Sequence, residues 1–395
     1  MCQFREKDLK NKSVEVSKEK CMLIQSALDS LSAHIAILDE EGIIRYTNKA
    51  WKDFARTNGL SLDECCEGTD YLRVTRDSEG RPGELTRAIE QVIQGKKEIY
   101  TEEYPCHGPE NQRWFRLKVT PFIGDGPYAA VISHENITEK KLSELKVEES
   151  LRKTRRLHDQ FLPRDYPDIS GFDFSSFYQP ANRLGGDFYH FIEINRHLIF
   201  YVSDVSGHDI SSAMLNIFLR EAVNSYLLSH SSGEELNPTH IMDYLGERYH
   251  QEDFPADYFI SLFLGVLDLE TRVIKAANAG FQYPPFLIRE GKYPAALNCS
   301  GMPISYLRSE LDDTSCSCSF ELAPGDILLT FTDGLIEQSS GEEDYSEKRL
   351  ADLIIQTNTS DAENLIRAIR KDFSQFKGSA PLQDDLTLLA LKRTE

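Results

Sequence analysis

The sequence lacks the features that would assign it to several common classes of protein. No segment approaches the roughly 20 apolar residues that cross a membrane, and Met1–Ser13 is polar and charged, without the apolar centre of a secretory signal. Basic residues are scarce, because 44 lysines and arginines stand against 64 aspartates and glutamates, giving a net charge of −20. A nucleic-acid-binding protein needs a basic face to neutralise phosphates. We therefore expect a cytoplasmic protein with no membrane span and no nucleic-acid partner.

The eight cysteines form no C-x-x-C pair, the arrangement that would indicate a structural zinc site or a redox centre. Cys316 and Cys318 would share one face of a strand, but no partner pair lies at zinc spacing. The favoured interpretation is a set of free thiols in a reducing compartment, and the alternative is a metal or redox site.

The segment 139–161 contains no glycine and no proline, and it is rich in Glu, Lys, Arg and Leu. This composition predicts one long exposed helix over Thr138–Phe161, which Pro163 ends. Its apolar residues form only a broken heptad, so a parallel coiled-coil linker and a single solvated spacer helix both remain open. Because 395 residues are too many for one core, we expect an N-terminal extension (1–20), a first domain (21–138), this linker (139–161) and a second domain (162–395).

The first domain combines apolar alternation, helical spacing and turn residues, which together predict a small mixed fold. The expected elements are a hairpin (His34–Leu38 and Ile43–Tyr46), two helices (Asn48–Thr57 and Glu84–Gln94) and three strands (Glu98–Pro105, Arg113–Pro121 and Tyr128–Glu135).

The end of this domain carries its most specific signal, a strand that runs into Asn136-Ile137-Thr138-Glu139-Lys140. Together with the preceding elements it resembles a PAS sensor domain, and the resemblance spans Cys21–Lys140. It implies an antiparallel sheet with helices, a tendency to dimerise and, in many members, a bound small ligand. No flavin-type N-C-R-F-L motif is present, so the ligand stays unidentified and a domain without a ligand remains open.

Histidines and aromatic residues in this domain admit a second interpretation, as ligands of haem or another cofactor. Such residues are more often ordinary parts of a core or a surface. We therefore expect no haem ligation by His34, His107 or His134, and core packing by Trp51, Phe54, Trp114 and Phe115.

Residues 162–395 alternate short β-rich runs with helical patterns and contain no internal repeat. Asn237-Pro238 is a typical helix start, because Asn caps a helix and Pro is preorganised for its first turn. The expected strands are Phe172–Tyr178, His197–Val202, Tyr258–Leu267, Val273–Asn278, Ile327–Phe331 and Leu386–Leu391, and the expected helices are Ser211–Ser229, Pro238–His250 and Ala362–Phe373.

Aspartates stand at four places where an apolar strand meets a turn, namely Asp187, Asp204, Asp333 and the pair Asp384-Asp385. A single aspartate at such a place is usually a turn former or a helix cap. Together, without His or Cys companions, these carboxylates have the oxygen chemistry that Mg²⁺ and Mn²⁺ prefer. Cations would also offset the repulsion between clustered carboxylates.

The motifs G-G-D-F, D-V-S-G-H, A-N-A-G, T-D-G and D-D-L-T follow one another between Gly185 and Thr387. This ordered set resembles the metal-dependent protein phosphatases (PPM), and more closely their SpoIIE-like bacterial branch, over Phe161–Lys392. The resemblance implies a sandwich of two antiparallel sheets flanked by helices, with a two-metal site at one edge. The whole chain would then be an α+β protein with an N-terminal PAS domain, a helical linker and an αββα phosphatase domain.

The same resemblance implies roles for individual residues. Asp204 would bridge two Mn²⁺ or Mg²⁺ ions, Asp187 and the Val205 carbonyl would complete the first site, and Asp333 and Asp384 would hold the second. These aspartates would be catalytic through a metal-activated water that attacks phosphorus without forming a phospho-enzyme. Weaker candidates for the site are Asp385, Gly186 and Arg183.

A few positions fit these motifs imperfectly. Asp209 stands where a Gly usually follows D-V-S-G-H, and it would either cap the helix at Ser211–Ser229 or add a charge near the ions. Phe281 stands where the family often has the His of A-G-H. G-G-D-F also resembles the start of the GGDEF motif of diguanylate cyclases, but Phe188 replaces the acidic fourth residue, which argues against that class.

The hypothesis from the sequence is a PAS-regulated serine/threonine phosphatase of a bacterial stress or developmental switch. The resemblance suggests a phosphorylated STAS-type anti-sigma-factor antagonist as its substrate. The PAS domain and the linker helix would form a homodimer and carry the signal. The alternative is a non-catalytic scaffold that binds a phosphoprotein, although a scaffold has no need to keep costly clustered charges.

Overall fold

The computed structural model describes residues 19–76, 83–108, 111–124, 126–182, 184–207, 210–230, 235–306, 316–357 and 361–395. The chain divides into two compact units, Met1–Val147 and Glu148–Glu395, each considered below by itself. Within the described residues, no helix combines the length and the apolar character that crossing a membrane requires.

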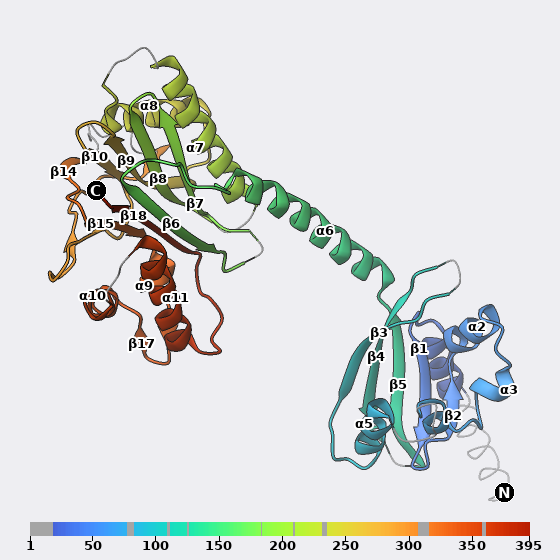
Figure 1. The fold of residues 1–395 in the computed structure, drawn as a ribbon. Coiled ribbons are helices and arrows are strands. Elements are labelled where there is room, and N and C mark those ends of the chain that lie inside the picture. The colour runs from blue at the N-terminus through green and yellow to red at the C-terminus, as the bar shows by residue number, and fades with distance from the viewer. Residues whose placement is uncertain are drawn as a thin grey trace, which may run out of the picture. The chain divides into compact units, whose positions relative to one another are not determined.

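The first unit is built on a five-stranded sheet in the order β2-β1-β5-β4-β3, with antiparallel neighbours throughout (Figure 1). The predicted hairpin and the three predicted strands all form within a few residues of their expected ends. The strands are β1 (His34–Asp39), β2 (Ile44–Thr47), β3 (Tyr100–Pro105), β4 (Trp114–Pro121) and β5 (Tyr128–Asn136).

Helices and one face of this sheet enclose the core of the first unit. Asn48 is fully buried and caps α2, because its Oδ1 accepts from Trp51 N at 3.1 Å and also from Ile35 N at 3.0 Å. This one amide therefore fixes the helix against β1. The helices are α2 (Lys49–Thr57), α3 (Leu62–Cys65), α4 (Tyr71–Val74) and α5 (Glu84–Ile93).

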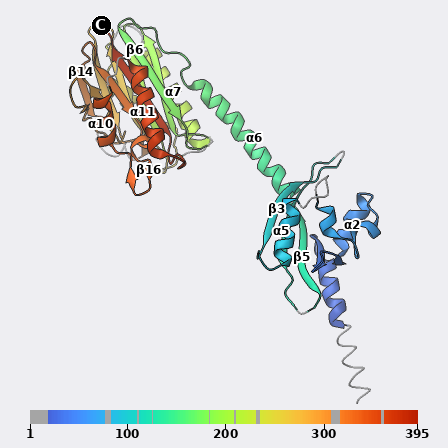
Figure 2. The same ribbon diagram turned by 60° about the horizontal axis from the view of Figure 1, so that its bottom comes forward.

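The predicted linker helix is present as α6 (Thr138–Phe161), the long helix that Figure 2 shows from a second side. Leu145, Val147 and Leu157 of this helix are exposed in the single chain. In the second unit its last turns pack inward, with His158 buried beside the ring of Phe188.

The second unit contains two antiparallel sheets, one in the order β14-β10-β9-β8-β7 with β13 beside β9, the other in the order β12-β11-β15-β18-β6. The first sheet comprises β7 (Asp187–Ile194), β8 (His197–Val205), β9 (Phe259–Asp268), β10 (Val273–Ala279), β13 (Ile304–Ser305) and β14 (Cys316–Glu321). The second comprises β6 (Phe172–Gln179), β11 (Phe286–Ile288), β12 (Ala295–Ala296), β15 (Ile327–Phe331) and β18 (Leu386–Arg393).

Helices cover the outer face of each sheet, which gives the predicted αββα layers. The strand β8 shows why its sequence is apolar almost throughout: Phe200 faces the core between the sheets, whereas Tyr201 faces the core under α7 and α8. The helices are α7 (Ile210–Ser229) and α8 (Pro238–Gln251) on the first sheet, α10 (Glu347–Gln356) and α11 (Ala362–Lys377) on the second, and the short α9 (Asp333–Ile336); β16 (Ser339–Ser340) pairs with β17 (Glu343–Asp344).

Candidate active site

Two of the predicted aspartates face each other in the first sheet of the sandwich. Asp187 opens β7, Asp204 lies one residue before the end of β8, and the antiparallel register pairs them directly. Asp187 is 1% exposed, so its carboxylate needs partners inside the protein.

The second sheet supplies those partners. Thr332, after β15, and Thr387, in β18, donate their hydroxyls to Asp187 Oδ2 at 2.7 and 2.6 Å. Asp333 follows Thr332 at the start of α9, and Asp384-Asp385 immediately precedes β18. The two sheets therefore bring the predicted aspartates to the same end of the sandwich.

Asp385 is buried and acts as a backbone anchor rather than as an open carboxylate. It accepts hydrogen bonds from Ala181 N at 2.8 Å, Gly186 N at 2.6 Å and Asp187 N at 3.3 Å, and it is 3% exposed. The side chain of the neighbouring Asp384 is exposed. Asp385 thus fixes the loop that presents Asp187.

Glycine is required where this loop and its neighbour approach other backbone segments. A β-carbon on Gly186 would lie 2.6 Å from the carbonyl oxygen of Val205 and 2.8 Å from that of Gly207. A β-carbon on Gly334 would overlap the carbonyl oxygen of Asp385. The glycines of G-G-D and T-D-G therefore allow backbone oxygens to lie beside the aspartates.

The carboxylates of this region hold their protons more tightly than usual. Burial, followed by the charges of Asp333 and Asp384, raises the pKa of Asp204 to about 8. Burial and then Asp384 raise the pKa of Asp333 to about 6. The pKa of Asp187 lies well above its ordinary value, mainly through burial and then through Asp204. A bound cation would offset the negative charge that accumulates here.

Several residues that position the site were not identified from the sequence. Thr332 and Thr387 stand inside the motifs T-D-G and D-D-L-T, so their place next to aspartates was the available signal. Asn216 of α7 donates from Nδ2 to the Gly186 carbonyl at 2.9 Å and accepts from Ser203 Oγ at 3.3 Å. A polar residue on the mostly apolar buried face of α7 was its signal.

Other sequence candidates are placed elsewhere or lie outside the described residues. Arg183 and Asp209 belong to the latter group. Phe281 is buried in the core between the two sheets, and its backbone N–H bonds Asn278 Oδ1 at 2.8 Å. This departure from the family pattern therefore fills the core rather than the carboxylate region.

The oxygen atoms at this end of the sandwich are of the type that binds a hard divalent cation. Carboxylate and backbone carbonyl oxygens are what Mg²⁺ and Mn²⁺ prefer, and the raised pKa values identify charge that such ions would offset. Among the described residues, however, no group of three or more His, Cys, Asp or Glu side chains is arranged so that it could hold a metal ion.

Comparison with known proteins identifies both units. Residues 195–394 match the family of Stage II sporulation protein E (SpoIIE), and residues 28–142 match the PAS fold. Among solved structures, the SiaA-PP2C domain of Pseudomonas aeruginosa superimposes with a TM-score of 0.55 at 20% identity, covering 64% of this chain and 98% of that domain. The second unit thus has the PP2C-type phosphatase fold. The chain belongs to the SpoIIE family and carries an N-terminal PAS domain.

Curated relatives match different shares of the chain. An uncharacterized 104.1 kDa protein of Rhodobacter capsulatus is 38% identical over 29% of this chain and 13% of its own length. Protein IcfG of Synechocystis is 24% identical over 62% of this chain and 41% of its own length. Phosphoserine phosphatase RsbU of Bacillus subtilis is 21% identical over 77% of this chain and 86% of its own length. The chain therefore spans less than half of the first two relatives.

Proposed function

We propose that this protein is a PAS-regulated, metal-dependent phosphatase that hydrolyses phosphoserine or phosphothreonine on a partner protein. The observation that carries the proposal is that Asp187, Asp204, Asp333 and Asp384, from two sheets, lie at one end of the sandwich. Similarity to phosphoserine phosphatase RsbU over most of both chains supports it.

Asp204 would lie between two Mn²⁺ or Mg²⁺ ions, with Asp187 and the Val205 carbonyl on one side and Asp333 and Asp384 on the other. The ions would supply the charge that activates a water and stabilises the phosphoryl oxygens. The chain itself holds Asp187 through two threonine hydroxyls and fixes the neighbouring loop through Asp385. Because the carboxylates repel one another, we infer that cation binding draws them together.

Metal dependence tests this proposal directly. Purified protein comprising residues 1–395, stripped of metal with a chelator, should hydrolyse p-nitrophenyl phosphate only after Mn²⁺ or Mg²⁺ is restored, with a rise of at least about 100-fold. The non-catalytic scaffold would instead bind phosphoprotein and show no turnover with either ion. Turnover that persists without added metal after chelation would contradict the two-metal proposal.

The partner is proposed to be a phosphorylated STAS-type anti-sigma-factor antagonist, because the chain resembles phosphatases of bacterial stress switches. A homodimer through the PAS domain and α6 belongs to the same proposal. The exposed Leu145, Val147 and Leu157 of α6 would be covered in such a dimer.

Regulation would require that the PAS domain hold the start of α6 firmly. Hydrogen bonds and an ion pair of the first unit attach this part of the helix to the sheet. Trp114 N donates to Thr138 Oγ1 at 3.0 Å, and Thr138 Oγ1 donates to Asn136 Oδ1 at 2.6 Å. One turn later, Lys141 pairs with Glu103 of β3 at 2.6 Å. Movement of β3 or β5 would therefore reach α6 directly.

Removing the Glu103 carboxylate should loosen this attachment. In Glu103→Gln, we expect hydrogen exchange in the first two turns of α6 to become a few-fold faster, because the ion pair to Lys141 is lost. Glu135→Gln is the matched control, since Glu135 contacts Arg116 at 3.5 Å without an ion pair to Lys141 in the described residues. Equal exchange in the wild type and both variants would show that Glu103 does not hold the helix.

A further inference from the structure

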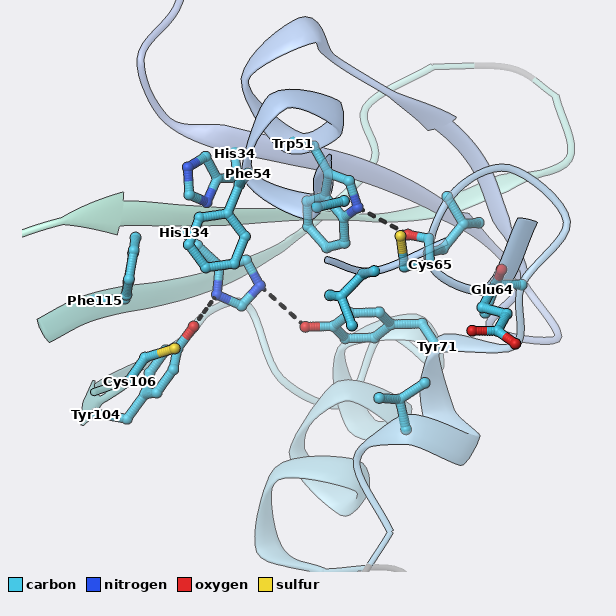
Figure 3. A pocket seen from close by; sticks show the side chains of 15 residues that line it. His34, Trp51, Phe54, Glu64, Cys65, Tyr71, Tyr104, Cys106, Phe115 and His134 are labelled. Carbon is cyan, nitrogen blue, oxygen red and sulfur yellow. Dashed lines mark hydrogen bonds between the residues drawn. The ribbon is translucent and has the colours of Figure 1, made fainter. Parts of the chain in front are cut away.

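The PAS domain contains a cavity of about 350 Å³ between its sheet and its helices (Figure 3). Its walls are mainly apolar and include the rings of Trp51, Phe54 and Phe115, and this volume lies in the range of small-molecule sites. The expectation that Trp51, Phe54 and Phe115 serve only as core is thus incomplete, because all three also line the cavity.

A chain of three polar side chains crosses this apolar space. His134 of β5 lies between two tyrosines, with Tyr71 Oη 3.0 Å from its Nε2 and Tyr104 Oη 2.6 Å from its Nδ1 (Figure 3). Both ring nitrogens are engaged, so His134 is not free to ligate haem. Burial lowers the pKa of His134 to about 4, and the ring is therefore neutral at neutral pH.

The hydrogen-bonded chain of Tyr71, His134 and Tyr104 has one more polar hydrogen than its two bonds use. A neutral imidazole has one N–H and one acceptor nitrogen, so it donates to one tyrosine and accepts from the other. The three groups hold three polar hydrogens but make two bonds. The hydroxyl hydrogen of the tyrosine that accepts is left over, and no acceptor for it occurs among the described residues.

A second polar group of the wall also lacks a partner. Thr69 lines the cavity, is 8% exposed, and its hydroxyl has no hydrogen-bond partner within the described part of the chain. Buried hydroxyls are normally bonded, because leaving one unpaired costs free energy. The Thr69 oxygen itself has almost no accessible surface, so a molecule in the cavity would not reach it as the side chains stand. The spare tyrosine hydrogen is therefore the group that calls for an acceptor from outside the chain.

The charge of the wall limits what can bind. Among the described residues that line the cavity there is no Lys or Arg, and their single carboxylate, Glu64, is exposed. An anion would enter without a counter-charge, and a quaternary cation would offer no acceptor to the spare hydrogen.

We propose that this cavity binds a small, neutral, planar aromatic compound whose carbonyl or ring-nitrogen acceptor receives the spare hydrogen of the Tyr71–His134–Tyr104 chain. Tyr104 neighbours Glu103 on β3, and Glu103 pairs with Lys141 of α6. The ligand thus contacts the strand that holds the linker helix.

Four probes of similar size test the proposal by isothermal titration calorimetry on the protein comprising residues 1–395. Coumarin is neutral and has a carbonyl, naphthalene lacks an acceptor, 2-naphthoate is anionic, and N-methylquinolinium is cationic. We expect coumarin to bind best, naphthalene about tenfold more weakly through the loss of one hydrogen bond, and both ions more weakly than coumarin. No binding of coumarin, or an equal or higher affinity for any other probe, would overturn the proposal.

Variants test the hydrogen count itself. The triple variant Tyr71→Phe, Tyr104→Phe, His134→Leu removes all three polar groups, and the ratio of coumarin to naphthalene affinity should fall to about one. The single variant Tyr104→Phe is the control, because one spare hydrogen remains and the ratio should persist. A ratio that is lost in the single variant would contradict the count. These readouts do not involve phosphatase turnover, so they stand apart from the proposed activity.

Discussion

Replacing Asp204 with Asn is expected to lower phosphatase turnover at least about 1,000-fold while leaving the metal-free protein no less stable than the wild type. The loss follows from the position of Asp204 opposite Asp187, where it is proposed to contact both cations. Metal ions contribute several kcal/mol to stabilising the charge of such a transition state, and about 4 kcal/mol corresponds to this factor.

The stability half of the prediction follows from the same carboxylate. The pKa of Asp204 is raised to about 8, first by burial and then by the neighbouring aspartates. The folded state then binds more protons than the unfolded state between about pH 4 and pH 8, so this group makes unfolding easier as the pH rises through that window. Asn is neutral and of similar shape, and it removes this penalty at neutral pH.

Two measurements check both halves. Turnover of p-nitrophenyl phosphate over a range of Mn²⁺ concentrations gives the first, and thermal unfolding with chelator at pH 5 and pH 8 gives the second. Asp165→Asn, at an exposed carboxylate of the same unit, should change neither. If Asp204→Asn retained more than about a tenth of the turnover, or unfolded far below the wild type without metal, the proposed role would be wrong.

Much of the fold was predictable, because local patterns determine most elements. The hairpin, the long helix Thr138–Phe161 and the strands β8, β9 and β18 all show their period or apolar run in the sequence. The strand Asp187–Ile194 was missed, since it lies at the edge of its sheet and His190 and Glu193 interrupt its apolar pattern.

The site was harder to predict, because its geometry depends on contacts between distant residues. Thr332 and Thr387 bond Asp187 across 145 and 200 positions of the chain. Which carboxylate of Asp384-Asp385 points inward was also not predictable from the sequence. The orientation of these side chains depends on how β18 packs against the loop before Asp187.

Substitution by Asn should lower the stability of the protein at Asp385 but hardly change it at the adjacent Asp384. Asp385→Asn is expected to cost about 3 kcal/mol of stability, because an amide has one acceptor oxygen and its NH2 group would face at least one of the three backbone N–H groups that the carboxylate accepts. Burial raises the pKa of Asp385, so the cost comes from these lost bonds and not from the lost charge. Asp384→Asn changes an exposed side chain and should alter stability by less than about 0.5 kcal/mol.

Metal titration separates positioning from direct ligation in this pair. If Asp385 acts through the loop that presents Asp187, Asp385→Asn should need about 10- to 100-fold more Mn²⁺ for half-maximal turnover, and its kcat should largely recover at saturation. Asp384→Asn, which removes a proposed ligand, should remain slow at every Mn²⁺ concentration. The reverse pattern would exchange the two roles and place the second cation on Asp385, against the burial and the three backbone bonds of that carboxylate.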